Sequence, residues 1–139
     1  MRESFPDLRI LSIGSLLLQE QLDVQRVGTI IECLRAEGVL RDPPIVATFG
    51  SSSLRYLVLD GTECVIALRR MQVPHILGQV VAPGSVATAR ALRVNYPLTE
   101  LMDGKTLADK NSALQQWIRA RMIDKAIRCY EEATILFDD

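Results

Sequence analysis

The sequence lacks the features that would place it in a specialised class of proteins. Its three cysteines, Cys33, Cys64 and Cys129, are odd in number and far apart, so they form neither a disulfide framework nor the close pairing of a zinc site. Lys and Arg number 16 against 17 Asp and Glu, a net charge of −1 that gives no global attraction to nucleic acid or an anionic membrane. The composition therefore implies no metal site and favours reduced thiols in a cytoplasmic protein.

Long apolar runs are also missing. No segment approaches the ~20 apolar residues that span a bilayer, and the start of the sequence, with Arg2, Glu3 and Asp7, lacks the apolar stretch of a signal peptide. We therefore expect neither membrane insertion nor secretion. The sequence has no internal repeat and no low-complexity segment. Its 139 residues, 48% of them hydrophobic, suffice for a compact α+β domain with a proper core.

One stretch, residues 56–71, changes its apolar period in the middle. An apolar run at 57–59 ends at Asp60-Gly61, and Val65, Leu68 and Met71 then recur at three-residue spacing. The pattern predicts a strand, a glycine turn and a helix. A helix N-terminus presents unpaired N–H groups and the positive end of the helix dipole, so this turn is a candidate phosphate site. The simpler interpretation is a plain connector with Thr62 as the helix N-cap.

The other elements follow from the same rules of periodicity and capping. Asp23 is expected to cap a helix that Gly38 ends, and the prolines at 43–44 predict a loop over 39–44. Strands are expected at 8–13, 45–49, 54–59 and 76–81, with a short apolar patch at 16–18 and helices at 23–37 and 62–71.

Residues 84–139 are expected to form a mainly helical extension that packs on the core or mediates dimerisation. Residues 85–95 fit a helix and a strand equally well, 98–102 suggest one helical turn, and 107–136 carry the longest helical pattern. Trp117 is expected in the core or in a dimer interface.

Several spaced features of residues 8–81 occur in the same order in a known superfamily. They are Leu17-Leu18-Gln19-Glu20, the helix after Asp23, the run Glu37-Gly38-Val39-Leu40-Arg41-Asp42-Pro43-Pro44-Ile45-Val46, then Tyr56-Leu57-Val58-Leu59-Asp60-Gly61, Ala67-Leu68 and Val73-Pro74-His75-Ile76. In this respect the chain resembles the ParB/sulfiredoxin-like superfamily, and in pattern most closely its SbnI/SerK branch of free serine kinases. The resemblance implies a ParB/sulfiredoxin-like mixed-sheet core over 1–83, followed by a long C-terminal helix.

The resemblance also implies roles for individual residues. Glu20 matches the carboxylate that serves the phosphoryl acceptor, Asp60 the carboxylate at the phosphate turn, and Gly61 the residue that lets the backbone approach the phosphates. The cofactor implied is ATP or ADP with Mg²⁺, and the acceptor is a small hydroxyl-bearing metabolite such as a free amino acid.

The chain departs from the family pattern at the turn. Gln19 stands where the family has a histidine, and Thr62, Glu63 and Cys64 replace its His-His-Arg as the residues that would hold the nucleotide. Arginine binds phosphate through charge-assisted, often bidentate, hydrogen bonds, whereas Glu63 brings a like charge. Mg²⁺ or the arginines at 55, 69 and 70 would have to compensate.

Three alternatives to a kinase stay open. The first is a catalytically inactive regulatory or protein-interaction module, which the changed turn favours. The second is a ParB-like DNA-binding partition protein, which the acidic pI of about 5.9 opposes. The third alternative makes Cys64 a redox nucleophile, because sulfiredoxins share the fold, against the simpler view of a small buried residue. The lone histidine, His75, is expected to serve a loop, not a metal.

Overall fold

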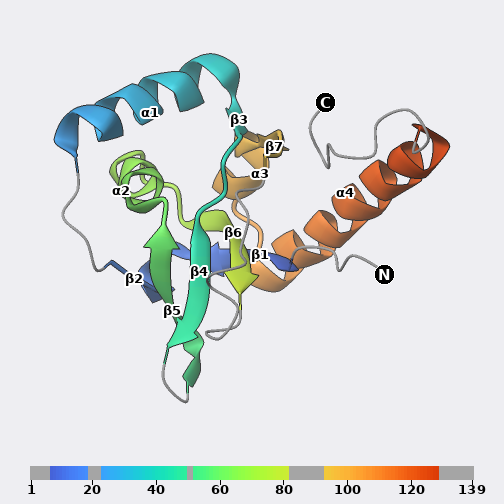
Figure 1. Ribbon diagram of the computed structural model, residues 1–139, viewed down its shortest axis with the longest axis horizontal. Helices are drawn as coiled ribbons and strands as arrows, with labels where there is room; N and C mark the ends of the chain where they lie inside the picture. The colour runs from blue at the N-terminus through green and yellow to red at the C-terminus, as the bar shows by residue number, and fades with distance from the viewer. Residues whose placement is uncertain (1–6, 19–22, 50–51, 82–92, 129–139) are drawn as a thin grey trace.

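The computed structural model describes residues 7–18, 23–49, 52–81 and 93–128. Five strands form one mixed sheet in the order β1-β6-β4-β5-β2, where β1 is Asp7–Ser12, β2 Leu16–Leu17, β4 Ile45–Phe49, β5 Ser52–Asp60 and β6 His75–Val81. A single 3₁₀ turn, Ile13–Ser15, joins β1 to β2. Strands β4 and β5 form an antiparallel hairpin, while β4 pairs in parallel with β6, and β2 with β5 (Figure 1).

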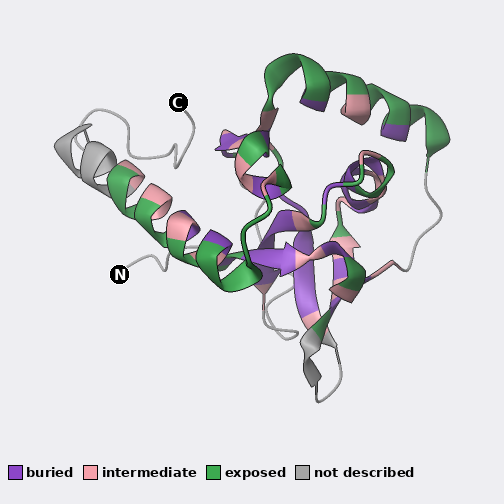
Figure 2. Cartoon of the chain, turned by 180° about the vertical axis from the view of Figure 1, so that it is seen from behind, coloured by how far each residue is buried: buried purple, intermediate pink, exposed green. Residues whose placement is uncertain are grey.

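The hairpin leads directly into the helix that the apolar period predicted. Helix α2 (Thr62–Arg70) connects β5 to β6. Because β5 runs antiparallel and β6 parallel to β4, strand β5 and helix α2 together form the connection between the parallel strands β4 and β6. Helix α1 (Val24–Glu37) packs on α2 on the side away from the sheet (Figure 1). Val27 and Leu34 are the buried positions of α1 and its outer face is exposed (Figure 2), as in an amphipathic helix.

Both ends of α1 are fixed by the residues that the sequence suggested. The carboxylate of Asp23 accepts hydrogen bonds from the backbone amides of Gln25 (3.0 Å) and Arg26 (3.3 Å). Gly38 ends the helix in the left-handed conformation, at φ 70°. The N-cap and C-cap predictions are confirmed.

The expected loop over 39–44 is in part wrong. Val39–Leu40 form a short strand, β3, that pairs antiparallel with β7, Tyr96–Pro97. The partner lies far along the chain, so no local pattern indicates the pairing. Helix α3 (Leu98–Met102) follows β7 as the predicted single turn. Of the ambiguous segment 85–95, residues 85–92 lie outside the described residues.

Helix α4 (Leu107–Arg128) is fastened to the open edge of the sheet. Asn111 donates to the carbonyl of Ile10 (3.0 Å) and accepts from its amide (2.9 Å), so one side chain pairs with the free edge of β1. Leu114 is fully buried in the same hydrophobic cluster as Ile10. Trp117 packs edge-on against Tyr96, with ring centroids 5.1 Å apart, which agrees with a core role. The predicted residues 129–136 of this helix lie outside the described residues.

A buried lysine joins α4 to two other elements. Lys110 is 1% exposed, and its ammonium lies 2.8 Å from the carbonyl oxygen of Leu101 and 2.8 Å from Nδ1 of His75. The histidine is therefore part of a polar contact between β6, α3 and α4. None of the helices in the described part of the chain combines the length and the apolar run that crossing a membrane needs.

Candidate functional site

The turn between β5 and α2 has the geometry of an anion-binding helix start. Gly61, at φ 95° and ψ 24°, is the N-cap, and its carbonyl accepts from the amides of Cys64 (3.0 Å) and Val65 (3.2 Å). The amides of Thr62 and Glu63 are left at the open end of the helix, where no preceding helical carbonyl can accept them. The N-cap is therefore Gly61. The connector interpretation, which made Thr62 the N-cap, was wrong in this respect.

Gly61 has a second reason to be glycine, which the sequence did not reveal. A Cβ atom at this position would lie 2.8 Å from Cβ and 2.9 Å from Cα of Pro44. Real Cβ atoms essentially never approach other atoms so closely, and the positive φ itself disfavours a side chain. The turn is thus packed directly against the proline segment that precedes β4.

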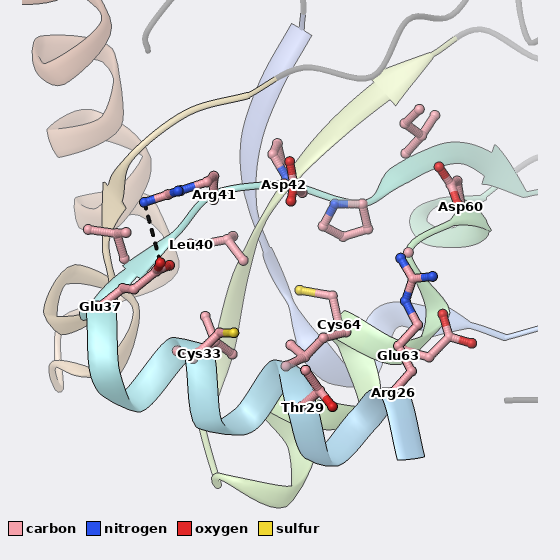
Figure 3. Close-up of a pocket in the computed structure, with 17 residues that line it drawn as sticks. Arg26, Thr29, Cys33, Glu37, Leu40, Arg41, Asp42, Asp60, Glu63 and Cys64 are labelled. Atoms are coloured by element: carbon pink, nitrogen blue, oxygen red, sulfur yellow. Dashed lines mark ion pairs between the residues drawn. The ribbon is translucent and has the colours of Figure 1, made fainter. Parts of the chain in front are cut away.

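A hollow of about 530 Å³ opens in front of this turn. Its walls are the inner face of α1, the segment 39–45 and the turn with the start of α2 (Figure 3). The volume falls within the range of ligand pockets in proteins. The structure thus brings together three segments that the sequence places up to 38 residues apart, from Arg26 on α1 to Cys64 on α2.

Four of the six residues proposed from the sequence line the hollow. They are Asp60, Gly61, Glu63 and Cys64. Thr62 is not among the lining residues and is 3% exposed, so its side chain belongs to the core face of α2. Glu20 lies in 19–22, outside the described residues.

The carboxylate of Glu63 is turned toward the other helix. Its Oε2 accepts a long hydrogen bond (3.4 Å) from the backbone amide of Asp23, the N-cap of α1. Glu63 therefore links the N-termini of the two helices, and a negative charge there is favoured by the dipole of α1. This contact explains the presence of a glutamate at position 63 without any ligand.

Cys64 does not have the properties of a reactive thiol. It is 7% exposed, and burial, together with the charge of Asp42, raises the pKa of the thiol to about 12. The reactive form of cysteine is the thiolate, so the side chain stays inert at neutral pH. This favours the small buried residue over the redox nucleophile.

The hollow contains charged residues that sequence inspection missed. Arg26 and Arg41 contribute guanidinium groups, and Glu37 and Asp42 add carboxylates to those of Asp60 and Glu63. Arg41 is paired with Glu37 at 3.6 Å. Asp42 is paired with Arg93 at 3.8 Å, outside the lining of the hollow. The two remaining carboxylates, of Asp60 and Glu63, outnumber the one remaining arginine, so the hollow disfavours a bare polyanion and favours one that arrives with a cation.

The arginines proposed as compensation from the sequence lie elsewhere. Arg55, Arg69 and Arg70 do not line the hollow, and Arg69 donates to the carbonyls of Ile13 (3.4 Å) and Leu16 (3.3 Å). Arg26 extends its guanidinium from α1 toward the turn, beside Glu63 and Asp60 (Figure 3). Arg26 stands three residues after the N-cap Asp23, where Glu or Gln is usual, and this exception was the one indication in the sequence.

No family model and no curated protein sequence matches the chain. Solved structures do match its fold. A free serine kinase in complex with AMP gives a TM-score of 0.53 at 18% identity, over 56% of this chain and 32% of that one. SbnI with a C-terminal truncation from Staphylococcus aureus gives 0.52 at 19% identity, over 55% and 31%. A conserved hypothetical protein from Pyrococcus furiosus gives 0.52 at 17% identity, over 55% and 32%.

The match spans about a third of the length of each of these structures. At such identities the likeness concerns the fold. The chain therefore has the ParB/sulfiredoxin-like fold, in the form seen in the free serine kinase and SbnI structures, as the sequence predicted.

Proposed function

We propose that this protein binds an adenine nucleotide, ATP or ADP with Mg²⁺, in the hollow between α1, the segment 39–45 and the turn at Asp60-Gly61. The observation that carries the proposal is the open helix start of α2 at the wall of a 530 Å³ hollow. It is supported by a solved structure of the same fold, a free serine kinase, that is in complex with AMP.

The residues present fit a nucleotide that carries its own metal ion. Mg²⁺ binds through one or two carboxylates and completes its shell with phosphate oxygens and water, and Asp60 offers such a carboxylate beside the open amides of α2. Within the described residues no group of three or more His, Cys, Asp or Glu side chains could hold a metal ion by itself. The protein would therefore take up the metal together with the phosphates.

The finer proposal is phosphoryl transfer to a small hydroxyl-bearing metabolite such as a free amino acid. In this mechanism Asp60 would hold Mg²⁺, which when bound would neutralise charge on the phosphates, and Glu20 would accept the proton of the acceptor hydroxyl. The hydroxyl oxygen would take the phosphoryl group, and ADP or AMP would leave. Catalysis would consist mainly of positioning the two substrates.

A second candidate is a nucleotide-binding module without catalytic activity. It is favoured by the hydrogen bond of Glu63 to Asp23, because the turn position that is basic in the kinases here serves the contact between two helices. The two candidates differ in product formation and not in nucleotide binding.

Calorimetric titration of the full chain with ATP and with ADP, each with and without Mg²⁺, tests the binding proposal. A response at millimolar nucleotide that depends on Mg²⁺ is expected, together with a rise in the thermal midpoint. Silence in both assays at that concentration would contradict the binding proposal.

Incubation with ATP or ADP and a panel of free amino acids including serine and threonine, followed by mass spectrometry, tests the chemistry. Glu20→Gln should leave binding intact and lower product formation by ~10²–10⁴-fold. Binding without any product from the wild type would favour the non-catalytic module.

A further inference from the structure

We infer that Arg26 of α1 is the residue that contacts the nucleotide phosphate, in place of the basic cluster that the turn lacks. This inference rests on the proposed nucleotide function. Arg26 lines the hollow, and its guanidinium reaches toward the turn at Asp60-Gly61 (Figure 3). Arg26 is an exposed residue, and among the described residues its guanidinium has neither a hydrogen-bond partner nor an ion-pair partner.

The place of Arg26 in its helix is unfavourable for stability. It is the third residue of α1, where a capping box has Glu or Gln so that the side chain can accept from the backbone amide of the N-cap. A cation in the first helical turn also faces the positive end of the helix dipole. Arginine at this position therefore does not stabilise α1.

Glu63 supplies the acceptor for the N-cap amide of α1, which Arg26 cannot provide. The N-cap amide of Asp23 donates to Oε2 of Glu63 at 3.4 Å, so the capping carboxylate comes from the neighbouring helix. Each of the two helix N-termini thus has a charged side chain from the other helix beside it. The carboxylate of α2 serves α1, and the arginine of α1 is directed to the start of α2, where the amides of Thr62 and Glu63 are open.

This arrangement matches the needs of a phosphate group. Guanidinium binds phosphate through bidentate, charge-assisted hydrogen bonds, and helix amides bind it through the dipole. A phosphate placed at the turn would meet the two kinds of donor from two different helices. It would also separate the guanidinium from the carboxylates of Asp60 and Glu63.

The test is calorimetric titration of the full-length protein with Mg²⁺-ADP and, separately, with adenosine, which lacks phosphate. Arg26→Ala should raise the Kd for ADP by ~10- to 100-fold, the scale of a charge-assisted hydrogen bond to phosphate. The Kd for adenosine should change less than about twofold, since adenosine carries no charge for the arginine to bind. Arg26→Lys should recover part of the ADP affinity.

Arg35→Ala is the matched control. Arg26 and Arg35 are both exposed residues of α1, but Arg35 lies nine residues on and so about half a turn away around the helix axis. Arg35→Ala removes the same charge as Arg26→Ala, but Arg35 does not line the hollow. Its Kd for ADP should stay within about twofold of the wild type, because a distant exposed charge is screened.

The outcomes separate this inference from the function on which it rests. If the wild type binds neither ADP nor ATP, both are wrong. If the wild type binds ADP and Arg26→Ala behaves like Arg35→Ala, the nucleotide proposal stands and the role of Arg26 is wrong. An equal loss of ADP and adenosine affinity would also refute a phosphate contact. Thermal midpoints check folding, and Arg26→Gln, which keeps the side-chain length, replaces the alanine variant if that variant does not fold.

Discussion

Replacing Gly61 by alanine should destabilise the protein before any ligand is considered. Left-handed backbone costs an L-residue about 1–2 kcal/mol, and Gly61 lies at φ 95°. The added Cβ would also meet the backbone and ring of Pro44 at 2.8–2.9 Å, an overpacking that typically costs about 1–3 kcal/mol. Together these terms predict a loss of about 2–5 kcal/mol in the free energy of unfolding.

Equilibrium unfolding in urea measures this loss, with the fluorescence of Trp117, the single tryptophan, as the probe. Gly38→Ala is the control, because Gly38 also has positive φ, at 70°, but nothing lies within 4 Å of an added Cβ. It should cost about 1 kcal/mol from backbone strain alone.

The difference between the two variants isolates the contact with Pro44. If Gly61→Ala costs no more than Gly38→Ala, Pro44 moves aside freely and the packing argument is wrong. The result also affects the function. Loss of ligand binding in a Gly61 variant is evidence for a phosphate contact at the turn only if the variant is folded.

Three further predictions concern the titratable groups. Lys110→Met should lower the free energy of unfolding by about 2–4 kcal/mol, because it leaves the buried carbonyl of Leu101 and the partly buried Nδ1 of His75 without their donor. The exposed Lys105→Met should cost less than about 1 kcal/mol in the same urea assay. Burial and the ammonium of Lys110 lower the pKa of His75 below its usual 6.5, against the opposing charge of Asp103. The unfolded chain therefore binds the proton more tightly, so stability is full above pH 6.5 and falls as the pH drops through 6.5 toward the lower folded-state pKa. His75→Gln, which does not titrate, should show a smaller fall in urea midpoint over that window, and an identical fall would contradict the assignment. Alkylation followed by peptide mass spectrometry should label exposed Cys33 in the native protein and Cys64 only after unfolding, and rapid native labelling of Cys64 would contradict its burial.

Sequence periodicity predicted the elements whose partners are local. The period change at Asp60-Gly61, the cap at Asp23 and the terminator at Gly38 each depend on a few neighbouring residues, and each is confirmed. The pairing of β3 with β7 was missed because two-residue strands have no period. A local pattern also cannot show which distant strand such a segment will meet.

The misplacement of Thr62 could have been avoided. The apolar set Val65, Leu68 and Met71, extended back by one step of three residues, reaches position 62 and places its side chain on the core face of α2. The structure has Thr62 3% exposed and outside the hollow. A helix start offers a ligand its backbone amides and only those side chains that lie off the apolar face, here Glu63.

The charges of the site could not be assigned from the turn alone. Within its own motif, Glu63 opposes phosphate binding, since the resemblance places a basic residue of the family pattern at this position. In the fold its carboxylate belongs to the N-terminus of α1, and the cation beside the turn comes from Arg26 of that helix. Because Arg26 and Glu63, 37 residues apart in the sequence, both lie at this turn, its electrostatics depend on the pair of helices and not on either sequence motif. The double variant Arg26→Glu with Glu63→Arg would place an acidic residue at the third position of α1 and a basic residue in the first turn of α2, as a capping box and the family pattern each have them.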